Sequence, residues 1–127
     1  MISTGHTSKQ FDADLDTVRA QVLQMGGLVE SQIQLAIEAL ISDDVPSMDR
    51  VINDDHRVNA MEMQIDENCS QIIVRRQPAA GDLRTVMTMV KTITDLERIG
   101  DEAAKIARIG KQLSQRKCLV LPRYTEI

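Results

Sequence analysis

Hydrophobic residues recur at intervals of three and four along most of the chain, beginning near Ser8. The first series consists of Phe11, Leu15, Val18, Val22, Met25, Val29, Ile33, Ala36 and Leu40. Such intervals place side chains on one face of an α-helix and are typical of the contact face of a helical bundle. No segment alternates with the two-residue period of a half-buried strand. The pattern therefore predicts a first helix, capped by Ser8, that extends to about Ile41.

Gly26 and Gly27 interrupt this helix at its middle. Each glycine costs about 1 kcal/mol of helix stability relative to alanine. Because the apolar stripe continues in phase after the pair, we expect a bend or a close helix crossing there rather than a chain break.

Two short breaks divide the rest of the chain. In the first, "SDDVPSMD" (42–49), Pro46 stands among acids at an opening position, which is a helix-start signal. A second helix is predicted from there to about Arg76. The second break is "RQPAAGD" (76–82), where Pro78 opens a third helix that extends to about Leu113. Short connections make consecutive helices antiparallel neighbours, so the predicted fold is all-α, an antiparallel three-helix bundle formed by residues 1–113.

The final stretch, "SQRKCLVLPRYTEI" (114–127), lacks the helical period. Its apolar residues are adjacent in the sequence, and Pro122 follows them. We predict a short irregular C-terminal tail.

Composition narrows the functional classes. A chain of 127 residues with 43% apolar and 27% charged residues is typical of one globular domain, and its core must be aliphatic because only 2% of residues are aromatic. A net charge of -4 and the scarcity of aromatic side chains argue against nucleic acid as a ligand. Cys69 lies in an apolar stripe and, like Cys118, has no metal-ligand spacing, so a reduced core thiol is expected. The sequence shows no secretory signal and no membrane-spanning apolar run, so a cytoplasmic location is expected.

Acidic residues interrupt the apolar stripe of the second helix. That stripe consists of Met48, Val51, Asp55, Val58, Glu62, Ile65, Cys69 and Ile72. Asp55 and Glu62 stand where a bundle ordinarily has Leu or Ile. Asp66 follows Glu62 by one helical turn and borders the same stripe, which makes an ExxxD pair.

The third helix has a second pair of the same kind, Glu97 and Asp101 in "LERIGDE". With a coiled-coil period of 3.5, its stripe becomes Val86, Met89, Ile93, Leu96, Gly100, Ala103, Ala107 and Gly110. The two carboxylates flank that stripe. With 100° per residue they lie close to Val90 instead, and on both interpretations they point toward or border a neighbouring helix.

These acids have three explanations: a metal site, an acidic patch for a basic partner, or an ordinary solvated surface. Buried carboxylates without partners cost several kcal/mol and repel one another. A hard cation relieves both costs, because such ions prefer carboxylate oxygens. The predicted metal ligands are Glu97, Asp101, Glu62, Asp66 and Asp55, and Fe, Zn, Mn or Mg are the candidate ions.

Catalytic signals are missing from the sequence. Neither His6 nor His56 follows a glutamate with the Glu-x-x-His spacing of di-iron bundles, and His56 is expected to be an exposed helix residue. The chain has no Ser-His-Asp order and no phosphate-binding glycine loop. We therefore predict no catalytic residues and do not expect an enzyme.

Four separated motifs resemble the PhoU family, the accessory proteins of bacterial phosphate-specific ABC transport systems. They are "VLQMGGLVE", "MEMQIDENC", "RRQPAAGDLR" and "DLERIGDEAAKI", in that order, within Phe11 to Gly110. The resemblance implies three-helix units with metal clusters at ExxxD motifs in some members, which fall here on Glu97 with Asp101 and on Glu62 with Asp66. It also implies a regulator at the cytoplasmic face of the membrane, peripheral at most, that restrains phosphate uptake. Its implied partners are the phosphate ABC-transporter ATPase and a phosphate-sensing histidine kinase.

Family members ordinarily contain two three-helix units in tandem, and this chain resembles the amino-terminal one. A single unit leaves apolar surface that the second unit would cover, so a homodimer is expected. The alternative functions are a carboxylate-bridged metal-storage bundle or metalloenzyme, and a structural dimerisation module whose acids only keep it in solution.

Overall fold

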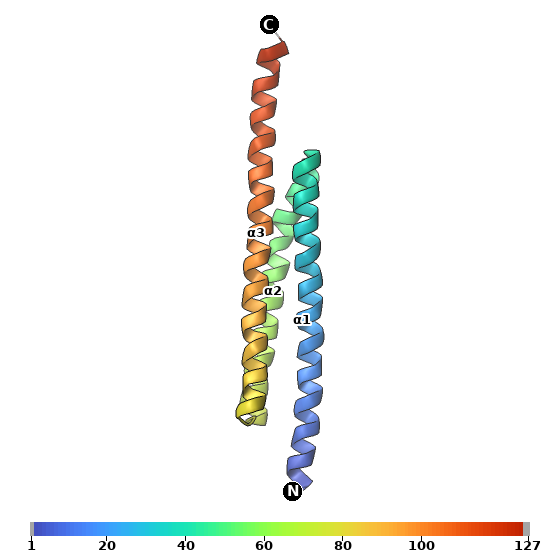
Figure 1. The fold of residues 1–127 in the computed structure, drawn as a ribbon, viewed down its shortest axis with the longest axis vertical. Helices are drawn as coiled ribbons and strands as arrows, with labels where there is room; N and C mark the ends of the chain where they lie inside the picture. Colours follow the sequence, from blue (N-terminus) through green and yellow to red (C-terminus); the bar gives the residue numbers. More distant parts are fainter. Residues whose placement is uncertain (1, 126–127) are drawn as a thin grey trace.

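Three long helices make up the protein, for which a computed structural model describes residues 2–125 and the side-chain surroundings of residues 9–119. They are α1 (Ile2–Ser42), α2 (Val45–Arg76) and α3 (Ala80–Thr125). All three lie side by side, and α2 runs antiparallel to α1 and α3 (Figure 1). Residues 2–125 contain no strand. The predicted all-α antiparallel three-helix bundle is therefore confirmed.

Local capping explains where the helices stop and start. At the first break, the Asp44 carboxylate accepts a hydrogen bond from the backbone N–H of Ser47 at 3.2 Å and one from its hydroxyl at 2.6 Å. This is the usual side-chain cap of a helix N-terminus. At the second break, Gln77 adopts a left-handed conformation (φ 46°), and its N–H donates to the Ile73 carbonyl at 3.1 Å. Both predicted breaks are confirmed.

The two outer helices are longer than the sequence pattern indicates. Helix α1 begins at Ile2, before the predicted cap at Ser8. Helix α3 continues to Thr125, so the predicted irregular tail is wrong for residues 114–125, and residues 126–127 lie outside the described part.

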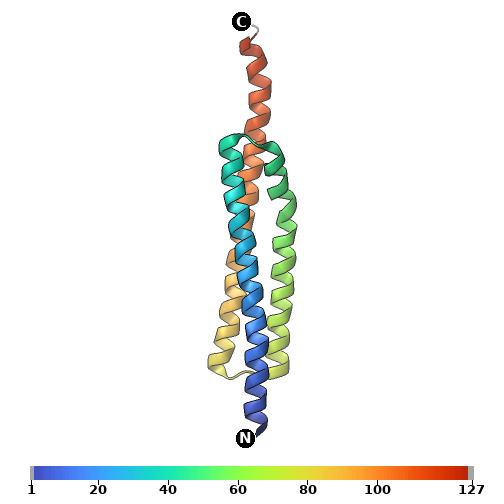
Figure 2. The ribbon, with the colours of Figure 1, turned by 90° about the vertical axis from the view of Figure 1, so that its right-hand side faces the viewer.

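Helix continuity past Leu113 has a simple physical reason. The segment is rich in Gln, Lys, Arg and Leu, which are good helix formers. It extends beyond the ends of α1 and α2 (Figure 2), so no neighbouring helix requires an apolar stripe there. Helix α3 continues through Pro122 and ends three residues later, at Thr125.

The core consists of the predicted apolar stripes, except that the buried position near the end of α1 is Ala39 and not Leu40. In α2 the buried residues are Met48, Val51, Val58, Ile65, Cys69 and Ile72. In α3 the buried residues Val86, Ile93, Gly100, Ala103, Ala107 and Gly110 belong to the stripe with a period of 3.5. Met89 and Leu96 of that stripe are half-buried, and Ala104 is buried outside it. In α1 the stripe is confirmed as far as Ala36, after which Ala39 is buried and Leu40 is 38% exposed.

Gly110 of α3 allows close helix packing, whereas Gly26 and Gly27 of α1 do not take part in packing within the chain. A Cβ atom built on Gly110 would lie 2.9 Å from Met48 Cε and 3.3 Å from Leu40 Cδ1, so Gly110 lets all three helices approach closely. No atom lies within 4 Å of a Cβ built on Gly26 or Gly27. The expected close crossing at this pair therefore does not occur within the chain.

Truncation of the core should be costly. Ile65 is 1% exposed, and Ile65→Ala removes three buried carbons, which costs about 2–5 kcal/mol of unfolding free energy. Met63→Ala on the same helix is the matched control, because Met63 is 72% exposed and its truncation should change stability by less than about 0.5 kcal/mol. Urea unfolding followed by circular dichroism measures both, and equal losses would contradict the assigned core.

Candidate functional site

Four carboxylates converge between α2 and α3. Asp55 and Glu62 come from α2, Glu97 and Asp101 come from α3, and all four are half-buried. Their mutual electrostatic effects, described below, place them within one cluster. We call these four residues the acidic cluster.

Gly100 allows the two helices to meet at this point. A Cβ atom on Gly100 would lie 3.2 Å from Val58 Cγ1 and 3.6 Å from Asp55 Oδ1. Gly100 precedes Asp101 directly, while Val58 lies between the two acids of α2. The close approach of the helix backbones therefore brings the carboxylates of α2 toward those of α3.

Two oxygens of the acidic cluster are buried without a partner. Asp55 Oδ1 and Glu62 Oε2 have almost no contact with solvent and form no hydrogen bond within the protein. A buried carboxylate oxygen that lacks a donor or a cation costs free energy, because the water it gave up is not replaced.

Burial raises the pKa values of three carboxyl groups in the cluster. Burial raises the pKa of the Asp55 carboxyl above its ordinary value, and the negative charge of Asp101 raises it further. Burial is also the largest cause of the raised pKa of Glu62, followed by the charges of Asp66 and Asp101. The pKa of Glu97 is raised by burial and then by a hydrogen bond with Asp101, for which one of the two carboxyl groups must hold a proton. Burial in the fold therefore makes the charged forms of Asp55, Glu62 and Glu97 less favourable than they are in water.

Arg108 acts on the acidic cluster and was not predicted from the sequence. Its positive charge lowers the pKa of Asp55, although burial and Asp101 outweigh it. Arg108 follows Asp101 by seven residues, which is two turns along one face of a helix. That spacing was the available signal for its position.

Asp66, the fifth predicted metal ligand, lies at the edge of the cluster. Asp66 is exposed, and its charge raises the pKa of Glu62. His56 is exposed as predicted, and its Nδ1 is hydrogen-bonded to the Asn53 carbonyl. The side chain of His6 lies outside the described residues. Cys69 is a buried free thiol, as predicted, and burial raises its pKa.

The cluster has the chemistry of a hard-cation site without a closed geometry. Carboxylate oxygens, two of them buried and without a donor, are the ligands that Mg²⁺, Mn²⁺ and iron accept. Across the part of the chain that the structure describes, no three His, Cys, Asp or Glu side chains are arranged to hold a metal ion. The chemistry of the donor set suits a cation, although the side chains as they stand do not form a metal site.

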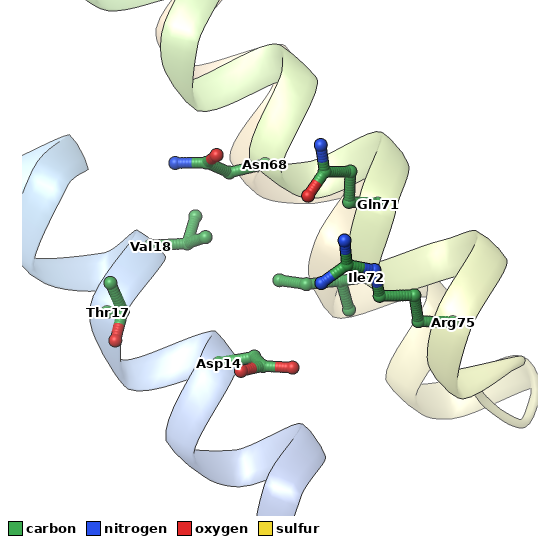
Figure 3. A pocket seen from close by; sticks show the side chains of 7 residues that line it. All are labelled: Asp14, Thr17, Val18, Asn68, Gln71, Ile72 and Arg75. Atoms are coloured by element: carbon green, nitrogen blue, oxygen red, sulfur yellow. The ribbon is translucent and has the colours of Figure 1, made fainter.

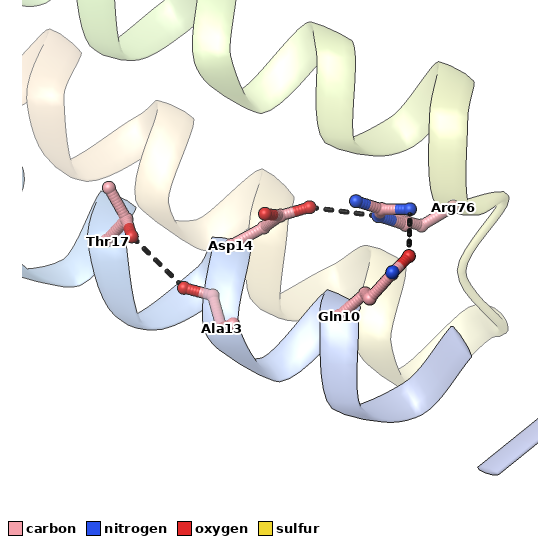
Figure 4. Close-up of polar contacts among 5 residues, drawn as sticks. All are labelled: Gln10, Ala13, Asp14, Thr17 and Arg76. Carbon is pink, nitrogen blue, oxygen red and sulfur yellow. Dashed lines mark hydrogen bonds and ion pairs between the residues drawn. The ribbon is translucent and has the colours of Figure 1, made fainter. Parts of the chain in front are cut away.

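A second polar surface lies between α1 and α2. This shallow cleft of about 210 Å³ is lined by Asp14, Thr17, Val18, Asn68, Gln71, Ile72 and Arg75 (Figure 3). Beside it, Arg76 Nε donates to Asp14 Oδ2 at 2.9 Å and Arg76 Nη1 donates to Gln10 Oε1 at 2.6 Å (Figure 4). These bonds fasten the first half of α1 to the end of α2, so we assign this surface a structural role.

Comparison with known proteins identifies the family. The sequence model of the PhoU domain matches residues 22–110, which contain the whole acidic cluster. This chain belongs to the PhoU family. It is 54% identical over 110 residues to the phosphate-specific transport system accessory protein PhoU homolog of a Burkholderia species. It is 53% identical over 103 residues to the phosphate-specific transport system accessory protein PhoU of Escherichia coli strain K12.

Solved PhoU structures share the fold. The crystal structure of PhoU from Pseudomonas aeruginosa matches with a TM-score of 0.81 at 49% identity, over 84% of this chain and 51% of that one. The phosphate transport system regulatory protein PhoU from Streptococcus pneumoniae matches with a TM-score of 0.76 at 33% identity, over 80% and 48%. The two curated relatives are covered over 47% and 43% of their length, against 87% and 81% of this chain. The chain thus spans about half the length of the PhoU proteins it matches, and these relatives are named as accessory or regulatory proteins, not as enzymes.

The acidic cluster should make stability depend on pH. Carboxyl pKa values raised above 3.8 for Asp55 and 4.5 for Glu62 and Glu97 mean that the folded state binds more protons than the unfolded state. Their contribution to stability is therefore complete below about pH 4 and is lost as the pH rises through the raised values. In EDTA, the urea midpoint of Glu62→Gln/Glu97→Gln should fall less between pH 5 and pH 7.5 than that of the wild type. Parallel pH profiles would contradict the assigned burial.

Loss of Arg76 should loosen the start of α1. Arg76→Ala removes the bonds of Arg76 with Asp14 and Gln10 that Figure 4 shows, at a cost of about 1 kcal/mol because the ion pair is partly exposed. Amide hydrogen exchange should accelerate around Gln10 to Asp14 and not at the acidic cluster. Arg57→Ala is the control, since Arg57 forms only an exposed pair with Asp54 at 3.9 Å, and a similar acceleration in both variants would exclude the anchoring role.

Proposed function

We propose that this chain is a regulatory adaptor of phosphate homeostasis that restrains uptake by a phosphate ABC transporter and keeps phosphate-starvation signalling off. The acidic cluster holds a metal ion in this role. The observation that supports the metal is the pair of buried, unpartnered oxygens on Asp55 and Glu62. Membership of the PhoU family supports the connection to phosphate transport, as do its relatives, which are named as accessory proteins of the phosphate-specific transport system.

In the proposed site, Asp55 and Glu62 of α2 and Glu97 and Asp101 of α3 would hold the ion, with Asp66 at the outer edge. A divalent or trivalent ion such as Fe, Zn, Mn or Mg supplies the positive charge that the cluster lacks. The residues of the proposed site have two different roles. Carboxylates from two helices provide the oxygens, and Gly100 keeps the helices close enough for both sets to face one ion.

The proposed partners are the transporter ATPase and a phosphate-sensing histidine kinase, met at the cytoplasmic face of the membrane. Support comes from the relatives, whose names place them with the phosphate-specific transport system. No helix within the described residues has both the length and the apolarity needed to cross a bilayer. Association through surface contacts, as a peripheral protein, is the corresponding part of the proposal.

The alternative of a metal-storage bundle or a carboxylate-bridged metalloenzyme has no specific observation in its favour. The acidic cluster contains no imidazole, and the one histidine with a described side chain, His56, is exposed. Di-iron bundles of the ferritin type draw two of their ligands from histidine.

Elemental analysis of purified protein tests the metal site. Wild type is compared with Glu97→Gln/Asp101→Asn, and the matched control is Asp95→Asn/Glu102→Gln, which removes the same charge from exposed positions of the same helix. The proposal predicts about one or more bound metal ions per chain in wild type and control, and a loss of at least tenfold in Glu97→Gln/Asp101→Asn. Absence of metal from all three proteins after incubation with iron, zinc or manganese would refute it.

A cellular assay separates the regulatory claim from the metal claim. In a bacterium that lacks its own family member, wild type and control should lower phosphate uptake and a phosphate-starvation reporter at high phosphate, and Glu97→Gln/Asp101→Asn should not. If the wild type binds metal but changes neither phosphate uptake nor the reporter, the metal site is supported and the regulatory role is overturned.

A further inference from the structure

Helix α1 buries one amide side chain among the apolar residues of its inner face. Gln32 is 5% exposed, and it lies between Val29 and Ala36, which are both in the core. Within residues 9–119 it is the one buried side chain that carries an amide, a hydroxyl or a charge. Burying an amide costs free energy unless it is hydrogen-bonded, so the partner of Gln32 indicates what this residue does.

The partner of Gln32 is the backbone of α2. Gln32 Nε2 donates to the Val51 carbonyl at 3.2 Å, and this bond is buried. In an α-helix the same carbonyl also accepts the N–H of the residue four positions later, which here is Asp55. The Val51 carbonyl therefore has a partner within α2 and does not need Gln32. The bond from Gln32 instead adds a directional link between α1 and the turn of α2 that ends at Asp55.

Apolar packing fixes the register of the helices only weakly at this level of the bundle. The fully buried residues that α1 and α3 contribute to the smaller apolar cluster are all alanines: Ala36, Ala39, Ala103 and Ala107. Methyl groups form low ridges, which interlock less than those of longer side chains. A hydrogen bond to one carbonyl has a preferred distance and direction, so it restrains both the sliding and the rotation of α2.

The turn of α2 that is linked to Gln32 presents Asp55 to α3. A Cβ atom on Gly100 would lie 3.6 Å from Asp55 Oδ1 and 3.2 Å from Val58 Cγ1. Asp55 Oδ1 is buried at this contact without a hydrogen bond. A small rotation of α2 that carried the carboxylate into water would lower its free energy. The fold must therefore oppose that rotation close to Asp55.

We propose that Gln32 is a positioning residue for the acidic cluster. Its bond to the Val51 carbonyl holds the turn of α2 in the register that keeps Asp55 at the contact with Gly100 of α3. Gln32 acts through Asp55 and not as a ligand, as residues behind the ligands of a metal site do. Its effect on cation binding rests on the proposed function, whereas its effect on the place of Asp55 does not.

A second amide link between α1 and α2 provides a matched control. Asn68 Nδ2 donates to Gln21 Oε1 at 2.9 Å, and this bond is partly buried. Asn68 lines the cleft between α1 and α2 (Figure 3) and does not belong to the acidic cluster. Gln21→Met therefore removes a link between the same two helices, as Gln32→Met does, but at a distance from Asp55.

Double-mutant cycles in EDTA at pH 7 test the place of Asp55. Asp55→Asn is introduced into wild type, Gln32→Met and Gln21→Met, and urea midpoints are measured by circular dichroism. Gln32→Met should remain folded, because methionine has a similar shape and the Val51 carbonyl keeps its helical bond. Gln32→Leu repeats the cycle with a second apolar side chain.

Asp55→Asn should raise the urea midpoint of wild type and of Gln21→Met by the same amount. In Gln32→Met the rise should be less than half as large, because Asp55 can already reach water there. The proposal is overturned if wild type shows no rise, if Gln32→Met shows the full rise, or if Gln21→Met loses the rise as well.

Titration with Mn²⁺, followed by calorimetry, tests the consequence for cation binding. The affinity of Gln32→Met for Mn²⁺ should be about tenfold or more below that of wild type, and the affinity of Gln21→Met should equal it. An unchanged affinity of Gln32→Met would overturn the role of Gln32 at the site. If wild type itself binds no Mn²⁺, the proposed metal site fails for this ion, and the cycles in EDTA decide the role of Gln32 by themselves.

Discussion

The site depends on one constraint: carboxylates occupy positions between α2 and α3 where a helical bundle ordinarily has apolar side chains. Asp55 and Glu62 occupy positions in the buried stripe of α2, and two of their oxygens find no donor inside the protein. Such an arrangement is unfavourable in the metal-free fold, as the raised carboxyl pKa values show. The rest of the bundle must therefore supply enough packing energy to hold the acids in position.

Two apolar clusters next to the acids supply this packing energy. The larger cluster extends from Phe11 and Leu15 to Val58 and Ile65, and the smaller one contains Ala36, Met48, Val51 and Ala107. Asp55 lies between Val51 of the smaller cluster and Val58 of the larger one. Asp55 thus lies at the junction of two well-packed regions, and Glu62 lies between Val58 and Ile65 of the larger one, so the free energy lost by burying the acids is offset by the packing around them.

Most of the fold could be predicted from periodicity because each helix faces the same core for most of its length. The α2 stripe, including its two acids, was correct at every position, since short apolar intervals leave one possible buried face. Two predictions were wrong at positions that do not face the core. The predicted irregular tail is helical because α3 past Leu113 contacts little of the bundle, and the expected close crossing at Gly26 and Gly27 is missing because Gly27 faces outward. Arg108 was missed because a single sequence shows which face a charge is on, not which acid on a neighbouring helix it meets. The convergence of Asp55 and Glu62 with Glu97 and Asp101 likewise needed the register between α2 and α3.

Membership of the PhoU family and the geometry of the acidic cluster support one account, in which a cation offsets the cost of carboxylates between two helices. The most direct test is the urea midpoint at pH 7 of wild type and Asp55→Asn/Glu62→Gln, measured in EDTA and again with added Mn²⁺, Fe²⁺ or Zn²⁺. The account predicts that the variant is the more stable protein in EDTA and that a cation raises the midpoint of the wild type alone. A wild type that is already more stable than the variant in EDTA, and that no cation stabilises, would contradict it.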